Sequence, residues 1–333
     1  MRVTVLHSSD ALEPPVDPVL EHVARALRGH GHTVSTISAA ADVVPVVQAL
    51  RDQQPDLVFN LAESFAGISA LESNVAALLN LLDLRYTGSS PAGLLLAGDK
   101  SLTKKLLRVH GIRTPEFATV YRGSLDWAGD IEFPVIVKPP QEDASIGITG
   151  GSVVSDLKEL FGRIDALQSE FRQPVLVEEF VDGREFYVGV LGNMEARALP
   201  VIELDFSGLP AGAPRIASWE AKWGADGSGA GPGAAASAEF AGTQSVFPTD
   251  LDPELAERMQ QVAIASFHAL RLRDYGRVDL RVNGHGEIFV LEVNPNCYLE
   301  RDAEYARAAL KDGIAYPELI GRIVELASAR YAR

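Results

Sequence analysis

The chain has 333 residues, of which 47% are hydrophobic and 23% are charged, and it carries a net charge of −15. This length predicts two or three domains with an ample hydrophobic core. The acidic balance argues against nucleic acid or an anionic membrane as the main partner, because both select basic surfaces.

The first 95 residues alternate strands and helices. The pattern predicts, beginning with a strand, the segments Arg2–Leu6, Asp17–Arg28, His32–Ile37, Val43–Arg51, Asp56–Leu61 and Ser73–Leu82. This alternation predicts a parallel sheet, whose ligands bind beyond the carboxyl ends of the strands. Asn60, Glu63 and Glu72 flank the end of the third strand. The G-x-G-x-x-G motif is missing after the first strand, so a nicotinamide or flavin enzyme is disfavoured.

A second unit of helices and strands follows. The predicted segments are a lysine-rich helix over Gly98–His110, a strand over Phe133–Pro140, a helix over Ser155–Leu167, and strands over Pro174–Phe180 and Glu185–Leu191. Lys138 ends an apolar strand, where an ammonium group must meet an anion, reach solvent or lose its proton. A nucleotide phosphate would be such an anion, and a lysine that extends into water is the alternative.

Carboxylates stand at the ends of the last two of these strands. Glu178 and Glu179 end one strand and Glu185 begins the next. Such a strand end can offer backbone groups to an adenine edge while a carboxylate binds the ribose hydroxyls; an acidic turn that faces water is the alternative. The loop over residues 141–151, which contains Ser145, could fold over phosphates with its backbone N–H groups.

Residues 224–233 read Gly-Ala-Asp-Gly-Ser-Gly-Ala-Gly-Pro-Gly, which is too poor in apolar area to order itself. The segment is either a linker or a lid, and long loops inside compact domains are more often lids or binding loops. Trp219 and Trp223 stand just before it. They favour a lid over residues 224–246.

The most informative segment is a predicted hairpin that follows a helix over Pro253–Leu270 and precedes a C-terminal helix over Tyr316–Tyr331. Because side chains alternate between faces, Val278, Leu280 and Val282 should share one face, as should Phe289, Leu291 and Val293. A turn centred between His285 and Gly286 would place Asp279 opposite Glu292 and Arg277 opposite Asn294.

Opposed side chains in such a hairpin lie about 4.5–5.5 Å apart, and like charges there repel. Two facing carboxylates therefore need a cation between them or protons on them. The oxygen ligands of Asp279, Glu292 and Asn294 suit Mg²⁺, which commonly shares its coordination shell with substrate phosphates. A solvated polar face is the alternative.

Other chemistries find little support. The histidines are scattered without H-E-x-x-H or C-x-x-C, which argues against zinc, and no G-x-S-x-G or Walker A motif occurs. Cys297 is the sole cysteine, so no intrachain disulfide is possible and a reducing compartment fits. Neither a signal peptide nor an apolar run of the ~20 residues needed for a membrane span is found, and we expect a cytoplasmic location.

In combination, these motifs resemble the ATP-grasp superfamily, and more closely the D-alanine–D-alanine ligase-like enzymes. The resemblance rests on Lys138 at a strand end, the glycine-bearing loop after it, the glutamates at 178, 179 and 185, and the hairpin. It is strengthened by Tyr86–Ser89, Asp99-Lys100, Thr103-Lys104, Gly111–Pro115 and Glu220-Ala221-Lys222.

The resemblance implies an α/β chain with an ATP-grasp fold in three subdomains. These are an N-terminal parallel-sheet domain over residues 1–95, a central subdomain over 96–182 and a C-terminal subdomain over 183–333. It implies an ADP-forming carboxylate–amine ligase that uses ATP with two Mg²⁺ ions, for which Mn²⁺ can substitute, and that passes through an acylphosphate. A homodimer is also consistent with it.

The resemblance implies roles for individual residues as well. Arg277, Lys222 and Ser145 are the candidate catalytic residues. The phosphate and nucleoside ligands would be Lys100, Lys138, Lys222, Glu178, Glu179, Val181 and Glu185, and the metal ligands Asp279, Glu292 and Asn294. The candidate substrate residues are Asn60, Glu63, Glu72, Trp223, Asn296, Tyr298 and Arg301.

This chain departs from the D-alanine enzymes where substrates bind. The family's glutamate after the first strand has no clear counterpart, Ala144 or Ser145 fills the serine position, and Trp223 replaces a tyrosine. A run from Pro295 to Arg301 replaces a small Ser-Pro-Gly-Met run. We therefore expect an amino-acid or peptide ligase with other substrates. The alternatives are a true D-alanine–D-alanine ligase and a nucleotide-binding regulator without catalysis.

Overall fold

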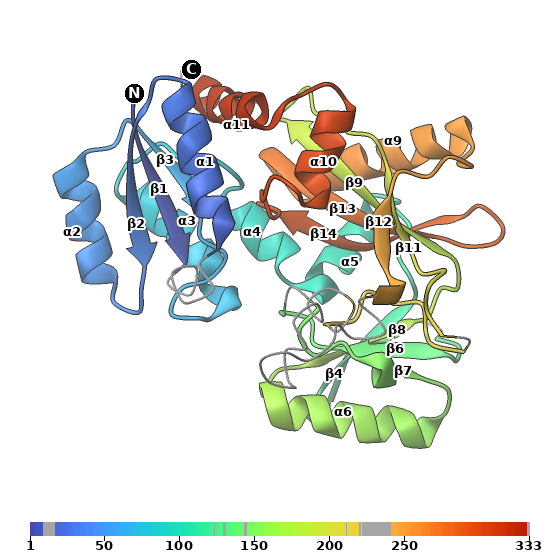
Figure 1. Ribbon diagram of the computed structural model, residues 1–333. Helices are drawn as coiled ribbons and strands as arrows, with labels where there is room; N and C mark the ends of the chain where they lie inside the picture. The colour runs from blue at the N-terminus through green and yellow to red at the C-terminus, as the bar shows by residue number, and fades with distance from the viewer. Residues whose placement is uncertain are drawn as a thin grey trace.

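The structure is a computed structural model that describes residues 1–8, 17–122, 124–128, 131–142, 145–210, 212–219, 221 and 241–331, with backbone alone at 125–128. Three sheets follow one another along the chain (Figure 1). Within the described ranges, no helix is long and apolar enough to cross a membrane.

The first sheet is parallel, with strand order β2-β1-β3, as the alternating pattern predicted. Asp17 and Asp42 cap the first two helices by accepting hydrogen bonds from Val19 N and Val44 N, each at 2.9 Å. The elements are β1 (Arg2–Ser8), α1 (Pro18–Gly29), β2 (Thr33–Ala39), α2 (Val43–Gln53), β3 (Leu57–Leu61), a short 3-10 helix η2 (Ser69–Leu71) and α3 (Glu72–Leu81).

Two helices connect this sheet to the second one. The helix α4 (Pro91–Ala97) was not predicted, although Ser90 caps it and a proline opens it. The predicted lysine-rich helix is α5 (Lys100–Val109), and Asp99 caps it by accepting from Leu102 N at 3.0 Å. Both helices pack against the third sheet, and α5 carries its lysines toward the hairpin.

The second sheet is antiparallel with order β5-β4-β8-β6-β7, and α6 covers one of its faces (Figure 1). Asp156 caps this helix by accepting a hydrogen bond from Glu159 N at 2.9 Å. The elements are β4 (Phe117–Tyr121), β5 (Ser124–Ala128), β6 (Val135–Lys138), η3 (Gly150–Ser152), β7 (Val153–Val154), α6 (Leu157–Phe171) and β8 (Val175–Glu179).

The third sheet is also antiparallel, with order β12-β11-β9-β13-β14 and β10 paired to β9. Helix α9 covers one face, while α10 and α11 cover the other. The elements are β9 (Arg184–Gly192), β10 (Arg197–Ala198), β11 (Ile202–Asp205), β12 (Gln244–Val246), α9 (Pro253–Ala269), β13 (Asp274–Val282), β14 (Ile288–Pro295), α10 (Glu304–Lys311) and α11 (Tyr316–Arg330).

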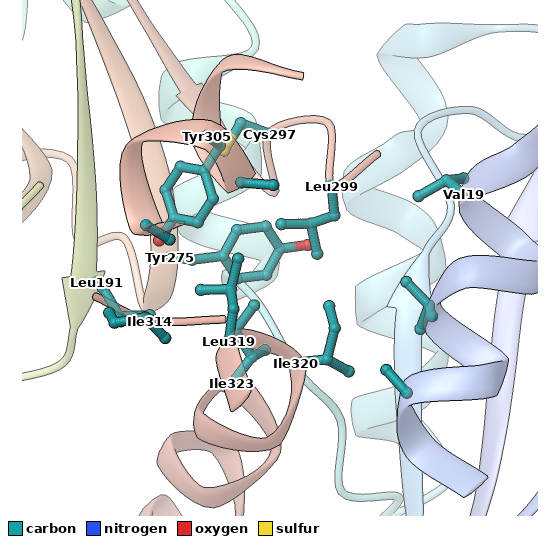
Figure 2. Close-up of a cluster of buried hydrophobic side chains, with 14 of the residues drawn as sticks. Val19, Leu191, Tyr275, Cys297, Leu299, Tyr305, Ile314, Leu319, Ile320 and Ile323 are labelled. Carbon is teal, nitrogen blue, oxygen red and sulfur yellow. The ribbon is translucent and has the colours of Figure 1, made fainter. Parts of the chain in front are cut away.

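One hydrophobic cluster joins the first sheet to the third. Figure 2 shows Tyr275 and Tyr305 beside Cys297 and Leu299, with α11 below them and Val19 of α1 facing them. The helix α11 therefore packs on α1 although it is remote in sequence. The division into three domains remains a prediction, and this shared core crosses the predicted boundary at residue 95.

The hairpin of β13 and β14 confirms part of the expected register and corrects the rest. Asp279 pairs with Glu292 and Arg277 with Asn294, but the register shifts after Asp279 and Leu280 pairs with Val290. The extra residue is Leu291. The expectation that Phe289 and Leu291 share the face of Val293 was wrong. Because of the bulge, Val290 is the residue that is buried in the core on that face, while Leu291 lines a pocket.

Candidate functional site

The polar face of the hairpin forms the centre of the site. The guanidinium of Arg277 donates from Nε to Asp279 Oδ1 at 2.7 Å and from Nη2 to Oδ2 at 2.9 Å. Its Cζ lies 4.5 Å from the centre of the Tyr187 ring. Burial alone would lower the pKa of Arg277, but the Asp279 carboxylate outweighs burial and raises that pKa well above its ordinary value. Arg277 therefore stays cationic beside the paired acids.

Lys100 brings a second cation to the same face. Its Nζ lies 2.6 Å from Glu292 Oε1 and donates to the carbonyl oxygen of Glu142 at 2.5 Å. The residue opens α5, and only 5% of its side chain is exposed. Both facing carboxylates of the hairpin thus have a cationic partner from this chain, which is one of the two solutions expected for such a pair.

Glu178 at the end of β8 forms ion pairs with two more cations. Its Oε1 lies 3.1 Å from Lys104 Nζ and its Oε2 lies 3.1 Å from Lys138 Nζ. Burial would raise the pKa of Glu178, yet the two ammonium groups lower it. Burial also lowers the pKa of Lys104, to about 8, because this side chain is enclosed and shares its carboxylate with Lys138. Lys138 was expected to meet an anion, and in this structure that anion is the carboxylate of Glu178.

Glu185 forms a further buried ion pair with Arg281. Arg281 also donates to the carbonyl oxygens of Arg215 at 2.9 Å and Val181 at 3.4 Å. Arg281 was missed at the sequence level, although strand alternation from Arg277 and Asp279 places it on the same face. Lys104 was also given no role, because one lysine on a helix carries no signal until its neighbours are known.

A pocket lies between the second and third sheets, where these groups meet. It is bordered by the ends of β6, β8, β9, β13 and β14, and its volume is about 70 Å³. Sites that bind small molecules usually enclose about 300 Å³ or more, so the pocket is smaller than such a site in this conformation. Its lining includes the polar residues Lys138, Ser145, Glu178, Glu179, Glu185, Asp279, Arg281 and Glu292, together with Val181, Tyr187 and Leu291.

The loop residue Ser145 reaches this pocket in a left-handed conformation with φ of 63°. Its hydroxyl donates to the carbonyl oxygen of Ala217 at 2.6 Å. The candidates Lys222 and Trp223, the loop residue Ala144, and nearly all of the expected lid lie outside the described residues. Their roles remain predictions.

The candidates near the first sheet lie at the carboxyl ends of its strands. The Asn60 side chain is fully buried, and its Oδ1 accepts from Ala62 N at 3.3 Å. Glu63 N donates to Ser8 Oγ at 3.0 Å, which ties the ends of β3 and β1 together. Glu72 opens α3. The structure places these residues at one edge of the sheet, as the parallel topology required.

The candidates after the hairpin hold the first sheet against the third. Asn296 accepts a hydrogen bond from Ser89 N at 2.8 Å, and the Tyr298 hydroxyl donates to Asp17 Oδ1 at 2.8 Å. Arg301 differs, because it is 54% exposed and pairs with the neighbouring Asp302. Two of the three candidates therefore make contacts that are structural in this conformation.

The hairpin also fits a divalent cation. The ligand set contains oxygen atoms from Asp279, Glu292 and Asn294, and the first two are directly opposed. The Asn294 amide nitrogen is buried without a hydrogen-bond partner in the described part of the chain, which is unusual for a folded protein. Because the oxygen and nitrogen of an amide can be exchanged by rotation, this side chain can turn toward a cation or a phosphate.

Comparison with known proteins identifies the family. Residues 106–325 match the family model described as D-ala D-ala ligase C-terminus. An uncharacterized protein, y4sG, of Sinorhizobium fredii is 33% identical, with 95% of this chain and 89% of that protein covered. The D-alanine–D-alanine ligase of Aquifex aeolicus is 30% identical, with 97% of this chain and 100% of that protein covered.

A solved structure agrees with these relatives. The D-alanine–D-alanine ligase of Bacillus anthracis, crystallised with ATP, superimposes with a TM-score of 0.75 at 22% identity, over 99% of this chain and 98% of that one. At this identity the likeness establishes the fold, which is the ATP-grasp fold. With the match to the family model and the relatives above, it follows that the chain belongs to the D-alanine–D-alanine ligase family of ATP-dependent enzymes that form C–N bonds.

Proposed function

We propose that this enzyme joins a carboxylate to an amine through an acylphosphate, releasing ADP and phosphate, with an amino acid as one substrate. The observation that carries the proposal is the opposed pair Asp279 and Glu292, which has Arg277 beside it and lines a pocket together with the buried cations Lys138 and Arg281. This arrangement suits phosphoryl transfer, in which positioning and charge neutralisation supply nearly all of the catalysis.

The ion pairs of the pocket suggest how a triphosphate would bind. Lys100 and Lys138 now pair with Glu292 and Glu178. Phosphate oxygens would replace these carboxylates as partners of the two ammonium groups, and the pocket of about 70 Å³ would widen in the exchange. Glu178, Glu179, Val181 and Glu185 border the part of the pocket proposed for adenine and ribose. Lys222 is proposed to complete the phosphate ligands.

Asp279, Glu292 and Asn294 would hold the Mg²⁺ ions. When bound there, the ions would neutralise charge on the phosphates of ATP. The chain's own contribution is to hold the two acids opposite each other and to pair each with a cation. Because Arg277 stays cationic beside Asp279, it can bind the phosphoryl group in transfer.

The reaction would proceed in two steps. A carboxylate oxygen of the first substrate attacks the γ-phosphorus, the bond to ADP breaks, and an acylphosphate forms. The nitrogen of the second substrate then attacks the acyl carbon, inorganic phosphate leaves, and the nitrogen loses a proton. Arg277 would stabilise negative charge in both steps, and Ser145, which lines the pocket, would help to orient the first substrate.

A second candidate is the ligation of two D-alanine molecules, which the names of relatives 28–32% identical to this chain favour. Four departures argue against it: the lack of a clear counterpart of the family's glutamate after the first strand, the loop at residues 144 and 145, the tryptophan at 223, and the run after Asn294. In this structure Tyr298 of that run reaches Asp17 of the first sheet's unit. A bulky segment after Asn294, where the family has a small run, favours substrates that differ in shape from D-alanine.

The test is a product screen with the full chain. The protein is incubated with ATP, Mg²⁺ and pooled amino acids, and the products are identified by mass spectrometry. Formation of ADP with a new amide is expected. D-Alanyl-D-alanine as the sole product would support the second candidate, and nucleotide binding without ADP formation in any pool would overturn the proposed ligation.

A further inference from the structure

The side chain of Lys104 is buried at the junction of three elements and belongs to none of the roles given above. It extends from α5 with 1% of its surface exposed. Its Nζ lies 3.1 Å from Glu178 Oε1 of β8 and donates to the carbonyl oxygens of Leu291 at 3.0 Å and Val290 at 3.5 Å in β14. One ammonium group therefore links the pocket glutamate to the strand that carries Glu292.

The carbonyl of Leu291 belongs to the bulge of the hairpin. The pairing passes from Asp279 with Glu292 to Leu280 with Val290, so Leu291 has no partner on β13. The extra residue of a bulge is left out of the ladder, and a buried backbone carbonyl requires a hydrogen-bond donor. Lys104 supplies that donor. The neighbouring Val290 N donates to Arg113 O at 2.9 Å.

The bulge determines which face of the sheet carries the side chain of Glu292. Between the turn and the bulge, Val282 pairs with Ile288 and Arg281 with Phe289. If this register continued without a bulge, Leu291 would lie opposite Asp279. A slip of one residue moves a side chain to the other face of a sheet. Glu292 would then face the core formed by Val278 and Leu280 instead of the pocket.

From these contacts we infer that Lys104 is a positioning residue, which stabilises the bulge at Leu291 so that Glu292 faces Asp279. The inference rests on the proposed function, because Glu292, which Lys104 would orient, is one of the metal ligands proposed for that site. Lys104 also holds one oxygen of Glu178, while Lys138 holds the other. Removal of Lys104 leaves Glu178 with a cation but leaves the bulge without its donor.

The test measures metal and nucleotide affinity separately in the full chain. Mn²⁺ binding is measured by electron paramagnetic resonance with a non-hydrolysable ATP analogue present. Binding of the same analogue is measured by calorimetry in EDTA. In Lys104→Met, the Kd for Mn²⁺ should rise at least tenfold, whereas the Kd for the metal-free analogue should change by less than threefold. A variant that merely weakens the fold would not separate the two affinities.

Lys158→Met is the matched control, since Lys158 is an exposed lysine on α6 and loses the same charge. It should bind both ligands like the unaltered protein. If Lys104→Met does not fold, Lys104→Gln, which keeps an N–H donor, is measured instead and should bind Mn²⁺ within threefold of the unaltered protein; a tenfold loss of Mn²⁺ affinity in this variant would overturn the inference. In Lys104→Met, unchanged Mn²⁺ affinity or an equal loss of both affinities would overturn it. An unaltered protein that binds neither ligand would overturn the proposed function as well.

Discussion

Asp279 and Glu292 lie directly opposite each other on β13 and β14, and each carboxylate has a cation of this chain as its partner. Arg277 pairs with Asp279, and Lys100 pairs with Glu292. The two acids are thus held in register by the backbone, and each is paired with a separate cation. We propose that a metal ion can replace one of these cations.

The first prediction concerns Glu292. Glu292→Gln removes one proposed metal ligand without changing side-chain size, so the rate of ADP formation should fall by about 10²–10³-fold while the circular dichroism spectrum is unchanged. Glu287→Gln is the control, because Glu287 lies in the same hairpin but pairs with Arg113 at the surface. It should keep activity, and near-normal turnover in Glu292→Gln would refute the metal assignment.

The second prediction concerns the buried pair of Asp274 and Arg330. Asp274 is fully buried, and it accepts from Arg330 at 2.7 and 2.9 Å and from Gly88 N at 2.8 Å. Arg330→Met leaves this carboxylate without its cation and should lower the free energy of unfolding by about 3–5 kcal/mol. Urea unfolding measures the change.

Arg322→Met in the same helix provides the comparison for Arg330→Met. Its pair with Glu318 is exposed, so the loss should be about 0.5 kcal/mol or less. Equal losses in the two variants would show that the buried pair contributes no more than a surface pair.

The third prediction compares two glycines that both have positive φ. A Cβ at Gly88 would lie 2.3 Å from Asn296 Oδ1, whereas a Cβ at Gly111 would meet nothing within 4 Å. Gly111→Ala should therefore cost only the backbone strain, about 1–2 kcal/mol. Gly88→Ala should cost about 1–3 kcal/mol more, because the overlap displaces Asn296. Thermal unfolding of both variants tests this difference, and similar melting temperatures would contradict it.

The fourth prediction concerns the reactivity of Cys297. Burial raises the pKa of this thiol well above its ordinary value, and 6% of the residue is exposed. Since the thiolate is the reactive form, labelling by a disulfide reagent at pH 8 should be at least about tenfold slower in the native protein than in urea. Equal labelling rates in the two conditions would show that the third sheet and α11 do not enclose this residue.

The fifth prediction concerns the pH dependence of stability. The cations Lys104 and Lys138 lower the pKa of Glu178 below its ordinary 4.5 in the folded state. Its stabilising contribution is therefore complete above pH 4.5 and is lost as the pH falls through the lowered value. The stability difference between the unaltered protein and Glu178→Gln, measured in urea, should be larger at about pH 6 than at about pH 4 and should shrink further in stronger acid. A difference that grows in acid would contradict the ion pairs.

The sequence alone determined much of this protein, because its signals are local. Alternating apolar runs indicated the parallel first sheet, and turn residues indicated the hairpin. Strand periodicity even placed Asp279 opposite Glu292. Each of these features depends on residues a few positions apart, whose geometry the backbone fixes.

The tertiary structure decided what depends on distant segments. The bulge at Leu291 needs a donor from α5, so periodicity within β14 could not reveal it, and Phe289 and Leu291 were assigned to the wrong face. The partners of Lys138 and Asp274 likewise come from other elements. A buried charge is satisfied by whichever group folding brings within hydrogen-bond distance, and spacing along the chain does not encode that choice.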